Sequence, residues 1–268
     1  MPMTKAGIRV RGASAALALV LLGLACPMAA WAAPPTPSAA ASLTAPGFTR
    51  SQPGVREAYI VSFGLFGGQS VFESEARGAA QILGERLPQA QSLVRFNSKR
   101  GGAATPRALA DALRAAGAAM EPSEDILVVA LTSHGSPDGL EVTEGRAGLL
   151  SPRMLKGMLD ASGATYRIVV ISACYSGVFA KVLADPRTLV ITAAAADRPS
   201  FGCEDGAIWT YFGDAFYNQA LRRQPTLEAA FADAKRLVTE RERRQGYKPS
   251  NPQIAGGSLV LGLLERQH

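Results

Sequence analysis

The sequence predicts an α/β protein built around a mostly parallel sheet with helices on both faces. Short, continuously apolar runs alternate along the chain with longer amphipathic segments, and two of these segments open with a Thr-Pro or Ser-Pro pair. Strands that are covered on both faces show continuous apolar runs, and a helix between successive strands makes them parallel. The 268 residues are 47% hydrophobic and 19% charged, which is enough apolar material for the core of one domain.

The apolar runs and the amphipathic segments give an ordered set of elements. Each expected strand is a run of apolar residues, and the last one is a return strand close to the C-terminus. The strands are expected at 58–63, 93–96, 126–131, 167–171, 188–192 and 258–263. The helices are expected at 71–87, 105–120, 151–161, 208–222 and 226–244, and a further helix is expected after Gly177.

The first 32 residues are expected to be a signal peptide for export. Lys5, Arg9 and Arg11 precede an apolar run over residues 13–25, and Ala-Trp-Ala at 30–32 has the small-x-small pattern of a cleavage site. We therefore expect an exported protein, either periplasmic or secreted.

Two alternatives would keep the protein at a membrane. Cys26 follows Gly-Leu-Ala at 23–25 and offers a lipidation site, although Gly23 stands where such sites usually have Leu. An uncleaved signal would be an anchor, but its apolar run is shorter than the ~20 residues that a spanning helix needs. A membrane tether is thus expected only through this N-terminal segment.

Residues 33–55 are rich in Pro, Ala, Ser and Thr without periodicity, and they are expected to be a flexible linker before a domain at 56–265. The full chain has a net charge of +6 from 28 basic and 22 acidic residues. Three of the basic residues and none of the acidic ones lie in the signal peptide, so the rest carries +3. This excess is too small to argue for nucleic acid, and we expect no nucleic-acid partner.

A histidine and a cysteine stand just past the ends of two expected strands. His134 lies in Thr-Ser-His-Gly-Ser at 132–136, and Cys174 lies in Ser-Ala-Cys-Tyr-Ser-Gly at 172–177. Ligands bind at the carboxyl ends of the strands in parallel sheets, so both side chains are expected on one rim. The only other histidine, His268, is the last residue of the sequence.

These residue types suit nucleophilic catalysis on a carbonyl group. The thiolate is the reactive form of cysteine, and an ordinary thiol with a pKa of about 8.5 is mostly protonated at neutral pH. An imidazole can take that proton during attack and return it to the leaving amine. The main-chain N–H groups of Gly135 and Cys174 are expected to stabilise the oxyanion. We therefore predict His134 as the general base and Cys174 as the nucleophile.

The cysteines could instead form a disulfide or be structural. Cys26 would leave with the signal peptide, so the mature protein would hold Cys174 and Cys203, which in an oxidising compartment can form a disulfide. A permanent disulfide would leave no nucleophile, whereas a reversible one would be an oxidative off-state. Cys203 is otherwise expected to be a structural thiol, because no second histidine remains to activate it.

The two segments together resemble the catalytic signature of the caspase-like clan of cysteine peptidases, and they are most similar to the legumain family, peptidase family C13. The likeness continues through 191–194 and 200–203 to Thr-Tyr-Phe-Gly-Asp at 210–214, so it covers about residues 58 to 220. The resemblance implies a caspase-like three-layer α/β/α fold and cleavage of peptide bonds by a His-Cys dyad through a thioester. It implies no metal and no other cofactor.

The substrate pocket departs from the pattern of that family. Legumains prefer Asn at the cleaved bond, and they use an Arg at the start of the first helix and a Glu two residues before the nucleophile. This chain has Phe72-Glu73 and Ser172 in those places, so the Asn preference is not expected to carry over. The resemblance implies Ser172, Ser200 and Asp214 as substrate-binding residues, and Arg77 and Arg198 are candidate donors for a substrate amide.

The expected activity is that of a cysteine-type endopeptidase acting on peptide or protein substrates. Water attacks the thioester in hydrolysis, whereas an amine attacks it in transpeptidation, and the dyad alone does not decide between them. A non-catalytic peptide-binding protein that keeps the fold is the third possibility.

Overall fold

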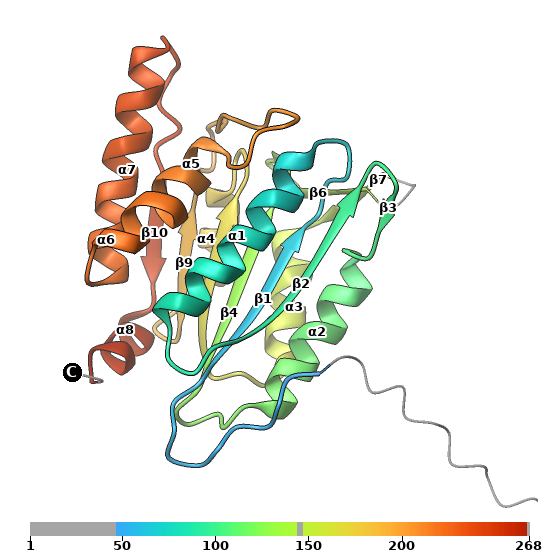
Figure 1. Cartoon of the computed structure of the whole chain (residues 1–268), viewed down its shortest axis with the longest axis vertical. Coiled ribbons are helices and arrows are strands. Elements are labelled where there is room, and N and C mark those ends of the chain that lie inside the picture. The colour runs from blue at the N-terminus through green and yellow to red at the C-terminus, as the bar shows by residue number, and fades with distance from the viewer. Residues whose placement is uncertain (1–46, 144–146, 267–268) are drawn as a thin grey trace, which may run out of the picture. The chain divides into compact units, whose positions relative to one another are not determined.

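The computed structural model describes residues 47–143 and 147–266, which belong to one compact unit (Figure 1). The expected signal peptide and most of the expected linker lie outside these residues. Residues 47–55 contain no helix or strand, but Phe48 packs on the ring of Tyr59, and Ser51 N–H donates to the Ala119 carbonyl at 2.8 Å. In the described part of the chain, no helix is both long and apolar enough to cross a membrane.

The strands of the main sheet are β1 (Ala58–Gly64), β2 (Gln91–Ser98), β3 (Gly101–Gly102), β4 (Ile126–Thr132), β8 (Tyr166–Ser172), β9 (Thr188–Thr192) and β10 (Gln253–Gly256). Their order across the sheet is β10-β9-β8-β4-β1-β2-β3. The five central strands run parallel, and the edge strands β3 and β10 run antiparallel to their neighbours. Every residue of β1, β4 and β9 is buried, because these strands are covered on both faces.

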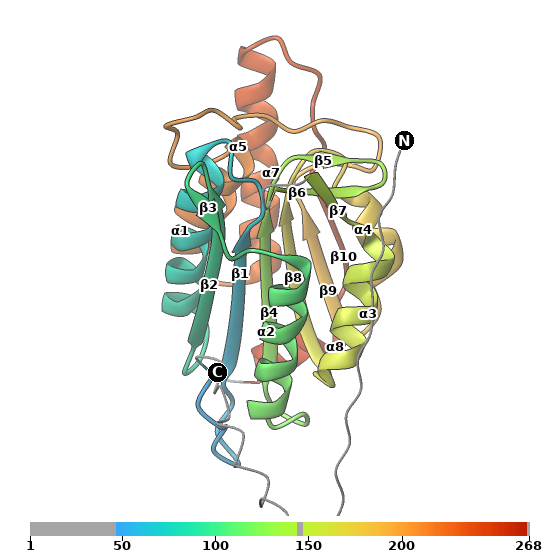
Figure 2. The same ribbon diagram turned by 90° about the vertical axis from the view of Figure 1, so that its right-hand side faces the viewer.

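Helices cover the sheet in two layers (Figure 2). One core contains residues of α1 (Ser70–Arg86), α5 (Tyr211–Gly213), the π-helix η1 (Asp214–Ala220), α6 (Leu221–Arg223), α7 (Leu227–Arg244) and α8 (Ser258–Glu265). The other core contains residues of α2 (Pro106–Ala119), α3 (Pro152–Ser162) and α4 (Gly177–Leu183). Side chains alternate between the faces of a strand, so Ile60 belongs to the first core and Val61 to the second. The predicted α/β/α arrangement is confirmed.

The expected return strand at 258–263 is wrong, because these residues form most of helix α8. The return strand is β10, which pairs antiparallel with β9 just before that helix. Gly256 and Gly257 have φ angles of +72° and +78°, a left-handed conformation that ends the strand and turns the chain. A short apolar run does not by itself distinguish a strand from a helix, which explains the error.

Two further elements differ from the expectation. The helix at 208–222 begins only at Tyr211, where the Thr210 hydroxyl accepts a hydrogen bond from Gly213 N–H at 2.9 Å, and its middle part is the π-helix η1. A small sheet of β5 (Gly135–Ser136), β6 (Gly139–Thr143) and β7 (Ala147–Leu150) follows β4. The small sheet lies past the carboxyl ends of the central strands (Figure 2).

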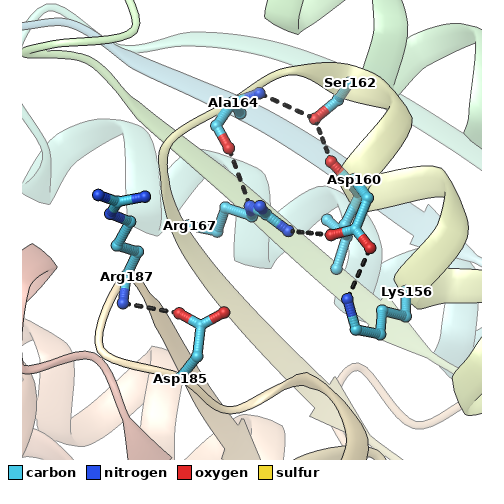
Figure 3. A network of polar contacts seen from close by, with 8 residues as sticks. Lys156, Asp160, Ser162, Ala164, Arg167, Asp185 and Arg187 are labelled. Atoms are coloured by element: carbon cyan, nitrogen blue, oxygen red, sulfur yellow. Dashed lines mark hydrogen bonds and ion pairs between the residues drawn. The ribbon is translucent and has the colours of Figure 1, made fainter.

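A network of polar contacts lies at the opposite end of the sheet, at the start of β8 (Figure 3). At the start of β8, Arg167 donates to Asp160 at 3.0 Å and to the Ala164 carbonyl at 2.9 Å. Lys156 contacts the second carboxyl oxygen of Asp160 at 2.6 Å. None of the predicted site residues takes part in this network.

Candidate active site

His134 and Cys174 lie at the same end of two neighbouring strands. β4 and β8 pair in parallel, and the last pair in their register joins Thr132 to Ser172. Each of the two predicted catalytic residues follows two positions later. Ser133 N–H donates to the Ser172 carbonyl at 3.2 Å, which continues the pairing past the strands. The register therefore brings His134 and Cys174 together on one rim.

Gly135 brings the main chain after His134 against the nucleophile. A Cβ atom at this position would overlap the Cys174 carbonyl oxygen and would lie 3.1 Å from the Ala173 Cβ, so only glycine permits the approach. The His134 carbonyl accepts a hydrogen bond from Glu141 N–H at 3.0 Å. Hydrogen-bonded and non-hydrogen-bonded residue pairs alternate along an antiparallel ladder, so the pair of Gly135 and Leu140 is a non-hydrogen-bonded one, and the Gly135 N–H points away from β6. Among the described residues, Cys174 N–H has no hydrogen-bond partner, which leaves this predicted oxyanion donor free.

The imidazole of His134 is half-buried beside two aromatic rings. Phe66 and Phe72 contact it edge-on, with ring centroids 4.6 Å and 5.1 Å from the imidazole centroid. Burial lowers the pKa of His134 below its ordinary value, and the negative charge of Glu141 opposes this by raising it. The neutral imidazole, which is the form that accepts a proton, is therefore favoured at neutral pH.

Gln69 is a site residue that the sequence pattern did not indicate. It directly precedes α1, and its amide oxygen lies 2.6 Å from His134 Nε2. Its amide nitrogen donates to the Cys203 carbonyl, which fixes the orientation of the amide. Because Nε2 faces an acceptor, this nitrogen carries the proton, and Nδ1 is the ring nitrogen that can accept one. The only signal in the sequence was the position of Gln69 after the first strand, on the same rim as His134.

The Cys174 sulfur is held by the main chain of Ser200. Ser200 N–H donates to Sγ at 3.2 Å, and the Ser200 hydroxyl lies 3.7 Å from it. The turn after the nucleophile is tight, because Tyr175 has a φ of +55° and its N–H donates to the Arg198 carbonyl at 2.8 Å. The loop at 198–200 therefore positions the thiol. In the described structure no hydrogen bond joins Cys174 directly to His134.

Cys203 and Cys174 are both free thiols in the structure. Burial, assisted by the charges of Cys174 and Glu75, raises the pKa of Cys203 to about 12. A thiol with this pKa stays protonated and is a poor nucleophile. The structure is thus consistent with a structural role for Cys203.

The three residues predicted to bind substrate do not gather at one point. Ser200 contacts the nucleophile. Ser172 is buried beneath the rim, and its hydroxyl oxygen lies 3.0 Å from that of Thr210. Asp214 lies in η1, 3.7 Å from Arg241, and lines a separate hollow of about 430 Å³. Of the three, only Ser200 hydrogen-bonds to the nucleophile in the described structure.

Glu75 is a second residue that the sequence pattern did not indicate. It is 1% exposed, its Oε2 accepts a hydrogen bond from Thr210 N–H at 2.8 Å, and its Oε1 has no partner. Burial raises the pKa of Glu75, and the hydroxyls of Ser172, Thr210 and Thr132 only partly oppose this. Because Thr132 and Ser172 end β4 and β8, an acid group lies beneath both strands that carry the predicted dyad.

Other ligand groups are scarce in the described part of the chain. No group of three or more His, Cys, Asp or Glu residues there could hold a metal ion. Of the two candidate donors for a substrate amide, Arg77 is paired with Glu73 at 3.1 Å and lies over the Phe96 ring, whereas Arg198 lines a hollow of its own.

The fold and the rim define a class of protein, an α/β/α protein of caspase-like fold with an imidazole and a thiol on neighbouring strand ends. The chain is similar to the crystal structure of caspase-1 from Spodoptera frugiperda, with a TM-score of 0.53 and 14% sequence identity, over 75% of this chain and 86% of that chain. At this identity the likeness shows the fold alone, and the predicted caspase-like fold is confirmed.

A model of the peptidase C13 family matches residues 110–260, which is more than half of the chain and includes both His134 and Cys174. The chain therefore belongs to the peptidase C13 family, and the legumain-like resemblance of its two segments is confirmed. A comparison with curated protein sequences found no match. The family supports a function of the cysteine peptidase type, and a peptidase acts on peptide or protein substrates.

Proposed function

We propose that this protein is a cysteine endopeptidase in which His134 and Cys174 form the catalytic dyad. The observation that carries the proposal is the register of β4 and β8, which puts a half-buried imidazole and a thiol at the ends of neighbouring strands. The contact of Gln69 with Nε2 supports it, since Nδ1 is then the ring nitrogen that accepts a proton.

The first half of the reaction breaks the peptide bond. His134 takes the thiol proton as the Cys174 sulfur attacks the carbonyl carbon, and the N–H groups of Gly135 and Cys174 stabilise the oxyanion that develops. The tetrahedral intermediate then collapses. The leaving amine takes the proton from His134 and departs, and the acyl part of the substrate stays on Cys174 as a thioester.

The second half releases the acyl group. Water attacks the thioester carbonyl while His134 takes one of its protons, and collapse of the second tetrahedral intermediate frees the new carboxyl group. The proton returns to the sulfur, so the thiol is regenerated. If an amine takes the place of water, the product is a new peptide bond, which is transpeptidation.

Cleavage of a fluorogenic peptide library by the purified protein under reducing conditions tests the proposal. Cys174→Ala removes the nucleophile and should abolish cleavage. His134→Ala should lower kcat/KM by roughly 10²–10⁴-fold, the usual contribution of a general base. Cys203→Ala is the matched control for the loss of a thiol and should retain most of the activity.

Different results would point to a contaminating enzyme, to a binding protein or to transpeptidation. Equal cleavage by the wild type and both dyad variants would assign the activity to another enzyme. An electrophilic thiol probe that labels Cys174 equally fast in the wild type and in His134→Ala would favour a non-catalytic peptide-binding protein. Mass spectrometry of products formed with an added amine peptide distinguishes hydrolysis from transpeptidation.

A further inference from the structure

A hollow lined by positive charge lies beside the candidate active site. It has a volume of about 370 Å³. Three of its side chains are cationic and none is acidic. This basic hollow is lined by Arg198, Lys235, Thr239, Arg243, Pro249 and Asn251.

The cations of the basic hollow are weakly neutralised by the protein itself. In the described structure, Lys235 and Arg243 form no ion pair, and Arg198 meets only Asp197, at 3.7 Å. The Asp197 side chain is 80% exposed, and such an exposed pair contributes little. By contrast, Arg236 on the same helix contacts two acidic side chains at 2.8 Å. The hollow therefore presents charge that is available to a ligand.

One wall of the basic hollow is the loop that positions the nucleophile. The Arg198 carbonyl accepts the N–H of Tyr175, the residue after the nucleophile, at 2.8 Å, and Ser200 N–H donates to the nucleophile's sulfur at 3.2 Å. The opposite wall belongs to α7 and the segment after it. This segment is tied to the same loop, because Ala195 N–H donates to the Ser250 carbonyl at 2.9 Å.

The basic hollow and the predicted dyad lie at the same end of the central sheet. Figure 1 shows the C-terminal end of α7 and the loop after β9 at the end of the sheet toward which the central strands point. That is also the end at which His134 and Cys174 follow β4 and β8. A substrate whose cleaved bond lies at Cys174 can therefore extend over the basic hollow.

We propose that the basic hollow binds an acidic side chain of the substrate, and so selects peptides that carry Glu or Asp at one position near the cleaved bond. A guanidinium group matches a carboxylate in both charge and geometry, and a cation without an internal partner gains the most from such a ligand. The inference rests on the proposed peptidase function, because it assigns the hollow to that substrate.

Matched peptides that differ only by Glu or Gln at one position test the inference, since the two side chains have nearly the same shape. For the wild type, kcat/KM should favour Glu by about tenfold at one position, and added salt should reduce this ratio. In the double variant Lys235→Ala/Arg243→Ala the ratio should fall toward one. Arg236→Ala removes a paired cation from the same helix and should retain the wild-type ratio.

Two kinetic results would overturn the inference: a Glu-to-Gln ratio near one at every position, or a preference for Glu that the double variant retains. Both require that peptides are cleaved, so they are distinct from a failure of the proposed function, in which no peptide is cleaved.

Binding gives a readout that does not depend on cleavage. Fluorescence anisotropy with Cys174→Ala protein should show tighter binding of the Glu peptide than of the Gln peptide, and Lys235→Ala/Arg243→Ala in that background should remove the difference. Inorganic phosphate should compete with the Glu peptide. Competition by phosphate without any difference between the two peptides would indicate a site for small anions only and would overturn the assignment to substrate.

Discussion

The buried acidic residues at the two ends of the central sheet differ in how completely their carboxyl oxygens are hydrogen-bonded. Where the strands begin, Glu57 and Asp125 are 6% and 0% exposed, and every oxygen of both carboxyl groups accepts a hydrogen bond. Where the strands end, Glu75 is equally buried, but one of its oxygens has no partner. The first end thus satisfies its buried acids completely, and the second does not.

This difference concerns the buried acids and does not extend to every buried polar group. Buried polar groups are normally hydrogen-bonded, and an exception calls for a local reason. The hydroxyl of Thr132, which ends β4, is a second buried group without a partner. His134 follows two residues later on the same strand end. Buried groups without a partner thus lie under the rim, at Glu75 and Thr132, and also where the strands begin, at Arg56 before β1 and at Thr188 in β9.

The largest expected effect is a loss of stability on removing a buried carboxylate from the end of the sheet where the strands begin. Asp125 accepts hydrogen bonds from Glu57 N–H at 2.8 Å and from Glu121 N–H at 2.7 Å. Asp125→Ala leaves both N–H groups without this partner, which should lower the free energy of unfolding by about 2–5 kcal/mol. Urea unfolding measures the loss, and Asp138→Ala on the exposed surface is the control. If kcat/KM per folded molecule also fell by orders of magnitude, the two ends would not be separable.

A smaller effect should come from Glu75. Its raised pKa means that the folded state binds a proton more tightly than the unfolded state. As pH rises from the ordinary Glu pKa to the raised one, the unfolded state loses its proton first, so the free energy of unfolding should fall by up to about 1.4 kcal/mol per pH unit. Glu75→Gln should flatten this dependence.

Urea unfolding at a series of pH values tests the Glu75 prediction. Glu57→Gln, an acid-to-amide change at the other end of the sheet, keeps Glu75 and should therefore keep the slope. An unchanged slope in Glu75→Gln would show that another group is responsible for the pH dependence.

The smallest expected effect concerns the general base. Glu141 raises the pKa of His134 against the effect of burial, so Glu141→Gln should lower this pKa further. His134 would then stay neutral to lower pH, and the midpoint of the acidic limb of the pH profile of kcat/KM should shift to lower pH by a fraction of a unit. Asp138→Asn, in the same β5–β6 hairpin, should leave the limb in place. A shift toward higher pH would contradict the assignment of that limb to His134.

The sequence predicted the parts of the fold that rest on local patterns. Continuous apolar runs indicated the five central strands, and Thr105-Pro106 and Ser151-Pro152 marked the starts of α2 and α3, where both hydroxyls accept the expected capping hydrogen bond. The last apolar run was misassigned, because its composition suits a strand and a helix alike. The small sheet of β5, β6 and β7 was missed: β6 (Gly139–Thr143) is as long as the predicted β9, but Glu141 interrupts its apolar residues.

The positions of His134 and Cys174 could be predicted because each follows an apolar strand, and parallel strands end on one rim. Their surroundings could not. Gln69 is 65 residues from His134 in the sequence, and its contact depends on how the start of α1 lies over the end of β1. Glu75 reaches Thr210 across 135 residues and looks, in the sequence alone, like an ordinary residue of an amphipathic helix.

The shortness of the edge strands bears on how the protein behaves at high concentration. β3 has two residues and β10 has four, and both run antiparallel to their neighbours. An exposed edge strand offers free main-chain groups to other molecules, and a short one offers few. The long strands β1, β4 and β8 lie inside the sheet, where native molecules cannot pair with them. β3 pairs only with Asn97 and Ser98, so residues 91–96 of β2 also lie along an open edge. Self-association of folded molecules through strands should therefore be confined to this stretch of β2, and elsewhere it should require at least partial unfolding.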